Sequence, residues 1–214
     1  MQFSMLLESW MSLVIIGITL IISIWALIDE DFRDKMAMVP YDMIMYREYW
    51  RLLTSGLVHG SVVHLTLNMT TFYFFAPVLE RHLGHWQLAG LYMLGLLLSN
   101  AATAIRYYQD SSYEGSVGAS GAISAVVLSA VVCNPFMSLG LPVLSAMYPV
   151  LTLPAYIAVL LFMAFSLIAS LVPQTAQGGV NHDAHFWGAV SGIALTFVFN
   201  PQVTGVLHHF WASL

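Results

Sequence analysis

Charged residues are scarce in this chain. Only 8% of its 214 residues are charged and 59% are hydrophobic, whereas an ordinary soluble domain has about 25% charged residues. So few charges cannot cover the surface of a soluble globule. The net charge of -5, together with the lack of a Lys/Arg-rich stretch, also argues against a nucleic-acid partner. The sequence therefore indicates a protein that lies in a lipid bilayer.

Cysteine and metal-binding motifs are nearly absent as well. The single cysteine, Cys133, can form neither an internal disulfide nor a cysteine metal site. No HExxH string occurs, which argues against a zinc protease. His182, Asp183 and His185 are close in sequence, but spacing alone is weak evidence for a metal. Every Asp and Glu lies in a predicted loop or at a span end, unlike the carboxylates of an intramembrane aspartyl protease. We expect no metal and no cofactor.

The apolar residues fall in long blocks between short polar interruptions, which is typical of transmembrane helices. Six candidate spans lie near residues 11–28, 62–79, 86–105, 119–133, within 144–172, and 184–199. The first lacks the basic leader and cleavage site of a secretory signal, so we interpret it as a retained span. We predict an all-α membrane protein, a six-transmembrane-helix bundle with a long first loop, and a single domain over residues 1–214.

The fourth span is too short to cross a bilayer. Residues 119–133 would form a helix of about 22 Å, compared with a hydrocarbon core of about 30 Å. If its far end reaches the opposite interface, Ser120 at its start lies about 8 Å below the near surface. The polar segment before it is tolerated at that depth only if it is buried in protein or lines a water-filled cavity. The sequence predicts a short central helix that begins with a sunken serine facing water.

Three polar side chains share this depth. The second, fourth and sixth spans cross in the same direction, so His64, Ser120 and His185 all lie at N-terminal ends on one membrane face. Each of them alone would more often be a helix-packing residue. Together they are suited to acyl transfer, because a serine hydroxyl is a poor nucleophile until an adjacent base takes its proton. Free backbone N–H groups at the start of the fourth helix could hold an oxyanion.

Small residues indicate how the histidine reaches the serine. Gly188 and Gly192 follow His185 at i+3 and i+7, so the three residues share one helix face. The fourth span offers a matching stripe of small residues, namely Gly121, Ala125 and Ser129. If these stripes pack together, the two backbones come close and bring His185 toward Ser120. Asp183 points to a different side of its helix, so we predict a dyad rather than a triad.

Additional hydrogen-bond donors lie on the second span. His64 and Asn68 stand at i and i+4 on one helix face. Such a pair can bridge helices, but beside Ser120 it can also donate hydrogen bonds to a tetrahedral intermediate. His59, in the preceding loop, could belong to the same network.

Taken together, these motifs resemble the rhomboid family of intramembrane serine proteases. The motifs are Trp50-Arg51, His59, His64-x-x-x-Asn68, Glu80-Arg81, Gly118-Ala119-Ser120-Gly121, and Ala184-His185 with Gly188 and Gly192. The resemblance covers about residues 49–200 and implies a bacterial-type six-helix core with a Ser120–His185 dyad. It also implies an oxyanion site from the Ser120 backbone, His64 and Asn68, structural roles for the remaining motif residues, and single-span membrane proteins as substrates.

One position departs from the family pattern. Many bacterial rhomboids have a tyrosine four residues after the nucleophile, stacked against the catalytic histidine, whereas this chain has Ser124. His185 must then be oriented in another way, either by an aromatic side chain such as Phe186 or Trp187, or by packing alone.

Orientation and exact activity stay open. The resemblance implies a bacterial cytoplasmic membrane, with the active site opening to the outer side. Four of the six Lys and Arg residues lie between the first two spans, which the positive-inside rule would place in the cytoplasm. We favour the family orientation, because acidic residues are interleaved with these cations. The alternatives to a general intramembrane protease are a catalytically silent rhomboid-like protein that binds membrane helices, and a rhombosortase that processes C-terminal anchors.

Overall fold

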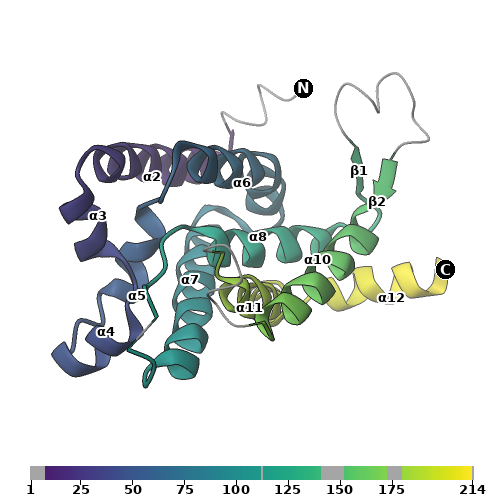
Figure 1. Cartoon of the computed structure of the whole chain (residues 1–214). Helices are drawn as coiled ribbons and strands as arrows, with labels where there is room; N and C mark the ends of the chain where they lie inside the picture. The colour runs from purple at the N-terminus through teal and green to yellow at the C-terminus, as the bar shows by residue number, and fades with distance from the viewer. Residues whose placement is uncertain (1–7, 112, 141–151, 173–179, 214) are drawn as a thin grey trace.

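Six helices correspond to the six predicted spans. The computed structural model describes residues 8–111, 113–140, 152–172 and 180–213. The six helices are α2 (Trp10–Ile28), α6 (Val62–Leu83), α7 (His85–Tyr107), α8 (Ser120–Cys133), α10 (Ala155–Ser170) and α11 (His182–Phe199), as labelled in Figure 1. The predicted all-α membrane fold is confirmed. Residues 144–151 and 173–179 around the fifth predicted span lie outside the described residues.

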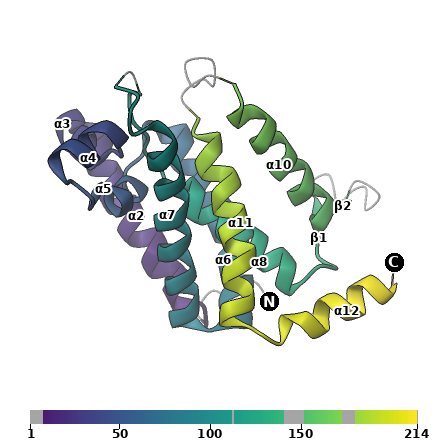
Figure 2. The ribbon, with the colours of Figure 1, turned by 90° about the horizontal axis from the view of Figure 1, so that it is seen from below.

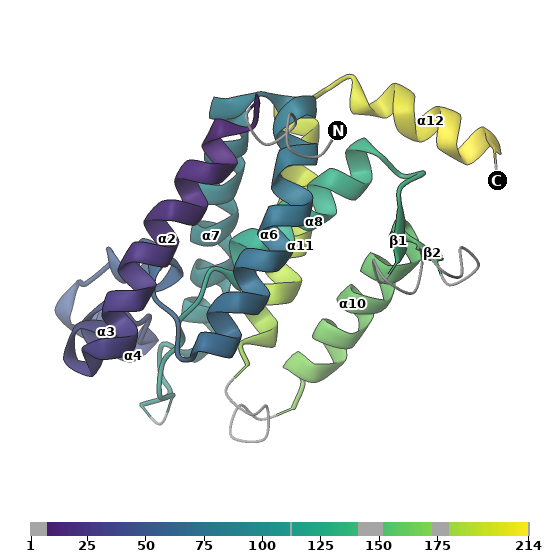
Figure 3. The same cartoon turned by 90° about the horizontal axis from the view of Figure 1, so that it is seen from above.

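The helices differ in their ability to cross a bilayer. By length and hydropathy, α2, α6 and α7 are each sufficient to span it. Helix α11 passes the same criterion only together with α12 (Val203–Ser213), from which it is bent by 115°. Figures 2 and 3 show α12 turning away from the bundle at that bend. Helices α8 and α10 are shorter apolar helices.

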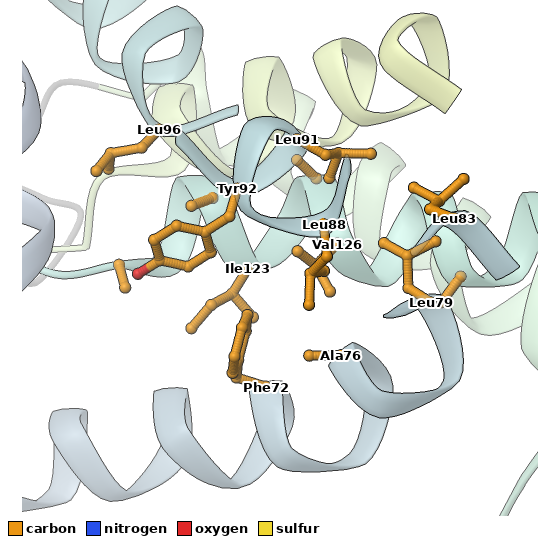
Figure 4. Packing of buried hydrophobic residues seen from close by; sticks show 14 of the residues in the cluster. Phe72, Ala76, Leu79, Leu83, Leu88, Leu91, Tyr92, Leu96, Ile123 and Val126 are labelled. Carbon is orange, nitrogen blue, oxygen red and sulfur yellow. The ribbon is translucent and has the colours of Figure 1, made fainter. Parts of the chain in front are cut away.

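Helix α8 lies at the centre of the bundle. It contacts α6, α7, α10 and α11, and none of its 14 residues is exposed. A helix that is apolar on all sides is suited to such a packed surrounding or to lipid. Figure 4 shows Phe72, Ala76 and Leu79 of α6 pointing toward Ile123 and Val126 of α8. The short helix is therefore held inside a shell of longer ones.

The predicted long first loop is folded into short helices. It contains α3 (Glu30–Met36), α4 (Pro40–Tyr46), α5 (Arg51–Thr54) and the 3-10 turn η1 (Ser55–Leu57). Arg51 joins them, because its guanidinium donates to the carbonyl oxygens of Asp34 at 2.9 Å and Ala37 at 2.8 Å and pairs with Glu48 at 2.6 Å. Its neighbour Trp50 is exposed.

This folded loop supports the segment before Ser120. Met38 and Ser116 exchange two backbone hydrogen bonds of 2.9 Å in an isolated antiparallel bridge. The Gly118 N–H donates to the Ser55 carbonyl at 2.8 Å. On the other side, the Asn100 amide of α7 donates to the Leu52 carbonyl at 2.8 Å and to the Ser55 hydroxyl at 3.0 Å. Hydrogen bonds of the backbone and of the Asn100 side chain thereby hold the folded loop and the approach to the central helix in place.

A two-stranded antiparallel sheet was not predicted. It pairs β1 (Ser138–Gly140) with β2 (Thr152–Pro154). Pro154 ends β2, and α10 begins at the next residue, which agrees with the preference of proline for helix starts. The described helix α10 lies within the range 144–172 that the sequence pattern indicated for the fifth span.

The Glu80-Arg81 motif joins three helices. The buried Glu80 carboxylate accepts hydrogen bonds from the backbone N–H groups of Met11 at 3.0 Å and Ser12 at 2.9 Å, and from the Ser12 hydroxyl. It also lies 2.6 Å from Nδ1 of His85, at the start of α7. A carboxylate at a helix N-terminus satisfies free donors and opposes the positive end of the helix dipole. Glu80 thus ties α2 and α7 to the end of α6, whereas Arg81 is exposed.

Candidate active site

A cavity of about 780 Å³ lies between α6, α8, α10 and α11. His64 and Asn68 of α6, Ser120 of α8 and His185 of α11 all line it. Its remaining wall is mostly apolar, with Leu67 and Phe75 from α6 and Ala158, Val159 and Phe162 from α10. Four polar side chains from three helices therefore line one largely apolar cavity. A few polar groups in an apolar wall are the usual composition of a ligand site.

Ser120 is the first residue of α8. No side chain caps this helix start, and the first backbone bond of the helix runs from the Ile123 N–H to the Ala119 carbonyl at 2.9 Å. The N–H groups of the preceding three residues therefore have no acceptor within the helix. The Ser124 hydroxyl donates to the Ser120 carbonyl at 2.8 Å. The nucleophile candidate thus sits beside unused donors at the positive end of a helix.

The glycines of α11 lie directly against α8. A Cβ atom added to Gly188 would lie 2.8 Å from the carbonyl carbon of Gly121 and closer still to its oxygen. One added to Gly192 would lie 2.5 Å from Cα of Ala125. The Ser129 hydroxyl donates to the Gly192 carbonyl at 3.0 Å. The two stripes of small residues pack backbone to backbone, and this packing sets the separation between Ser120 and His185.

His185 is surrounded by rings rather than by acids. Its ring centroid lies 5.8 Å from that of Phe162, at an interplanar angle of 34°, and 5.6 Å from that of His182, nearly perpendicular at 88°. Within the described residues no hydrogen bond joins the Ser120 hydroxyl to the His185 ring, and such contacts are often long before substrate binds. Phe186 and Trp187, which the sequence suggested as neighbours, pair with each other instead.

Asp183 serves a different helix. Its buried carboxylate accepts hydrogen bonds from Arg106 and, at 3.1 Å, from the Tyr107 hydroxyl, both at the end of α7. Asn181 caps α11 by accepting from the Ala184 N–H at 2.9 Å, and it also lines the cavity. An asparagine just before a helix is a recognisable cap signal, but the sequence interpretation overlooked it. The start of α11 is therefore fixed by polar contacts that leave the His185 ring unpaired with an acid.

His64 is packed against the segment that leads to Ser120. Gly118 has a φ of +116°, and a Cβ there would lie 2.6 Å from Cε1 of the His64 ring. Only glycine meets both demands, because a side chain would be strained and would displace the ring. The Asn68 amide donates one hydrogen bond to the His64 carbonyl at 3.1 Å, its amide has a second N–H to donate, and the residue lines the cavity.

His59 lies outside the cavity lining and is fully buried. Its Nδ1 is 2.8 Å from the Ser23 hydroxyl, which in turn donates to the Leu57 carbonyl. The Ala119 N–H donates to its Nε2 at 3.5 Å. Burial, followed by the nearby His64 ring, lowers the pKa of this loop histidine to about 3. Both ring nitrogens have internal partners, so we infer that neutral His59 supports the approach to Ser120 and does not face an oxyanion.

The described side chains of the site do not form a metal-binding group. Among the described residues, no group of three or more His, Cys, Asp or Glu side chains is placed to hold an ion. The arrangement instead combines a hydroxyl, an imidazole and unused N–H donors, which are the parts required for acyl transfer.

Comparison with known proteins places these features in a family. A sequence model of the Rhomboid domain matches residues 46–202. The chain is 27% identical over 151 residues to a Bacillus subtilis (strain 168) protein named "Putative rhomboid protease YdcA", covering 71% of this chain and 67% of that protein. Two Arabidopsis thaliana proteins, RHOMBOID-like protein 4 and RHOMBOID-like protein 1, are 30% and 29% identical over 71% and 79% of this chain. The matches span only 34% and 40% of the length of these plant relatives.

Proposed function

Because this chain belongs to the rhomboid family, we propose that it is a serine endopeptidase that cleaves transmembrane segments of single-span membrane proteins. Ser120 is the nucleophile and His185 is the general base. The mechanism requires neither a metal ion nor an organic cofactor.

The meeting of Ser120 and His185 in one cavity carries the proposal. The two residues belong to different helices and lie far apart in the sequence, yet both line the hollow beside the free N–H groups of α8. A purely structural serine in a membrane helix usually returns its hydroxyl to the backbone. The hydroxyl of Ser124 does so, whereas the Ser120 side chain faces the cavity.

The chemical steps follow from this placement. The Ser120 hydroxyl oxygen attacks a substrate carbonyl carbon, and His185 accepts the hydroxyl proton. The Ser120 backbone N–H, the free Asn68 N–H and the His64 ring stabilise the negative oxygen of the tetrahedral intermediate. His185 then protonates the leaving amine. Water attacks the acyl-enzyme by the same route, returning a proton to Ser120 and releasing the carboxylic acid.

The substrate enters the cavity between α6 and α10, along its apolar walls. Leu67, Thr71 and Phe75 of α6 face Ala158 and Val159 of α10 across the hollow, a surface suited to an apolar chain. An intact helix keeps its carbonyl groups in its own hydrogen bonds, so only a segment that unwinds locally exposes one to Ser120. This requirement selects substrates by helix stability rather than by a long sequence motif.

The test is cleavage in a membrane. The purified protein should be reconstituted into liposomes with a generic single-span substrate, and the products should be mapped by mass spectrometry. A cut within the hydrophobic segment supports the proposal. Binding without any cut would favour a catalytically silent helix-binding protein, and cleavage restricted to C-terminal anchor segments would favour a rhombosortase.

Replacing Asn68 with alanine should lower kcat about a hundredfold, because one oxyanion donor is lost while the nucleophile and base remain. Thr66→Ala is a matched control on the same helix, since the Thr66 hydroxyl donates to its own helix at Val62 and is exposed. An Asn68→Ala enzyme with unchanged kcat would remove Asn68 from the oxyanion site.

We further propose that the protein lies in a bacterial cytoplasmic membrane with the cavity open to the outer side. Helix α12 then lies at the cytoplasmic face, because it follows the end of α11 opposite His185. A reporter enzyme that is active only in the cytoplasm should therefore be active when fused to the C-terminus. A reporter active only on the outer side would reverse this orientation.

A further inference from the structure

The orientation of His185 presents a specific problem in this chain. The family pattern supplies a tyrosine from the nucleophile's own helix, but Ser124 stands at that position. The Ser124 hydroxyl donates to the Ser120 carbonyl, and among the described residues no hydrogen bond joins it to the His185 ring. Asp183, the acid nearest in sequence, is bound to Arg106 and Tyr107. The group that holds the His185 ring must come from elsewhere.

Helix α10 provides an aromatic ring at this place. Phe162 lines the cavity and lies 5.8 Å from the His185 ring, tilted by 34°. Centroid separations of 4.5–7 Å are those at which aromatic pairs attract each other. One turn further along α10, Phe165 meets the edge of the His182 ring at 5.3 Å. Two phenylalanines of α10 therefore pack against two histidines of α11.

We propose that Phe162 is the positioning residue for His185. Its ring, on a neighbouring helix, takes the place of the aromatic ring that this chain lacks at Ser124. The inference rests on the proposed function. Phe162 limits rotation of the imidazole about its side-chain bonds, so that one ring nitrogen stays directed toward the Ser120 hydroxyl. Because general-base catalysis depends on this alignment, the contact acts on the chemical step rather than on substrate affinity.

The position of Phe162 also links the base to α10. Helix α10 packs on α11 and α8 with one side and exposes Leu160, Leu161 and Ile168 on the other. It also forms one wall of the cavity. A displacement of α10 that widens the cavity therefore withdraws the ring that holds His185. In this chain, the base is aligned only when α10 lies against the start of α11.

The first measurement separates positioning from docking. Phe162→Ala should lower kcat about tenfold or more, with KM within about twofold of the wild-type value, because the loss of one aromatic contact misaligns the base. Phe162→Tyr, which keeps the ring, should retain activity. Phe165→Ala removes the same side chain from the same helix but leaves the contact with His185, so its kcat should match that of the wild type. Equal unfolding midpoints would show that all variants are folded.

The second measurement is a rescue. Ser124 and Phe162 line the same cavity, so a tyrosine at position 124 can occupy space that Phe162→Ala vacates. The double variant Ser124→Tyr/Phe162→Ala should recover most of the lost kcat. Recovery of kcat while the unfolding midpoint and KM stay unchanged would separate positioning of His185 from repair of packing and from substrate binding.

The outcomes distinguish the two levels of the proposal. If the wild-type protein cleaves and Phe162→Ala has the same kcat as Phe165→Ala, Phe162 does not position His185, and the protease assignment stands. If Phe162→Ala raises KM alone, Phe162 is a substrate contact and the inference is wrong. If the wild-type protein shows no cleavage of any substrate, the proposed protease function is wrong, and so is the positioning role of Phe162.

Discussion

Cleavage should disappear when either Ser120 or His185 is replaced by alanine. Each single substitution is expected to reduce kcat by a factor on the order of a million, since nucleophile and base act as one unit. Without the hydroxyl no acyl-enzyme can form. Without the imidazole the hydroxyl retains its proton and remains a poor nucleophile. Reconstituted liposomes with a single-span substrate provide the measurement, and a serine-directed fluorophosphonate should label the wild type but not the Ser120→Ala variant.

Two controls match these variants. Ser191→Ala removes a buried hydroxyl that donates to its own helix at Gly188, and His82→Ala removes an exposed histidine at the end of α6. Both should cleave at close to the wild-type rate. Cleavage by Ser120→Ala at close to the wild-type rate would show that another group is the nucleophile, and the dyad would have to be abandoned.

Replacing Gly188 with valine should have the next largest effect. An added Cβ at Gly188 meets the Gly121 backbone at 2.8 Å and less, whereas ordinary contacts begin near 3.4 Å. Neither backbone can bend aside within a packed helix pair, so α8 and α11 must separate by roughly 1 Å. A displacement of this size between reacting groups costs about a hundredfold in rate, and overpacking costs about 1–3 kcal/mol in stability. Valine should therefore lower kcat beyond a hundredfold and reduce the unfolding midpoint.

The same substitution at Gly17 is the control. Nothing lies within 4 Å of a Cβ built at this glycine of α2, so Gly17→Val should leave both kcat and the unfolding midpoint nearly unchanged. If Gly188→Val behaved like Gly17→Val, the close approach of α8 and α11 would not determine the separation of the serine and histidine.

The sequence predicted those parts of the fold that depend on local composition. Long apolar blocks predicted the helices, because backbone groups in lipid must be satisfied within the segment. The shortness of residues 119–133 predicted a short helix, and α8 has 14 residues; the depth of its start below the membrane surface stays a prediction. The i+3 and i+7 glycines after His185 predicted the face that α11 turns to α8, since side-chain periodicity follows directly from helix geometry.

Features that depend on distant partners were not predicted. The short helices of residues 29–60 are held by Arg51 bonds to backbone carbonyls, which no apolar periodicity signals. The Glu80 carboxylate binds the start of α2 at Met11 and Ser12, and nothing near Glu80 in the sequence indicates this partner. Phe162 was missed for the same reason: a ring on another helix becomes a neighbour of His185 only through tertiary packing, whereas Phe186 and Trp187 were suggested by proximity in the chain.

The shortness of α8 restricts how the depth of Ser120 could change during evolution. One residue inserted into this 14-residue helix would shift the serine by about 1.5 Å along the axis and turn it by about 100°. The hydroxyl would then face a different neighbour. Only an insertion of about a full turn restores the direction in which the serine hydroxyl points, and it moves the serine by about 5.4 Å along the helix axis. The depth of this hydroxyl can therefore change in discrete steps but not by gradual drift.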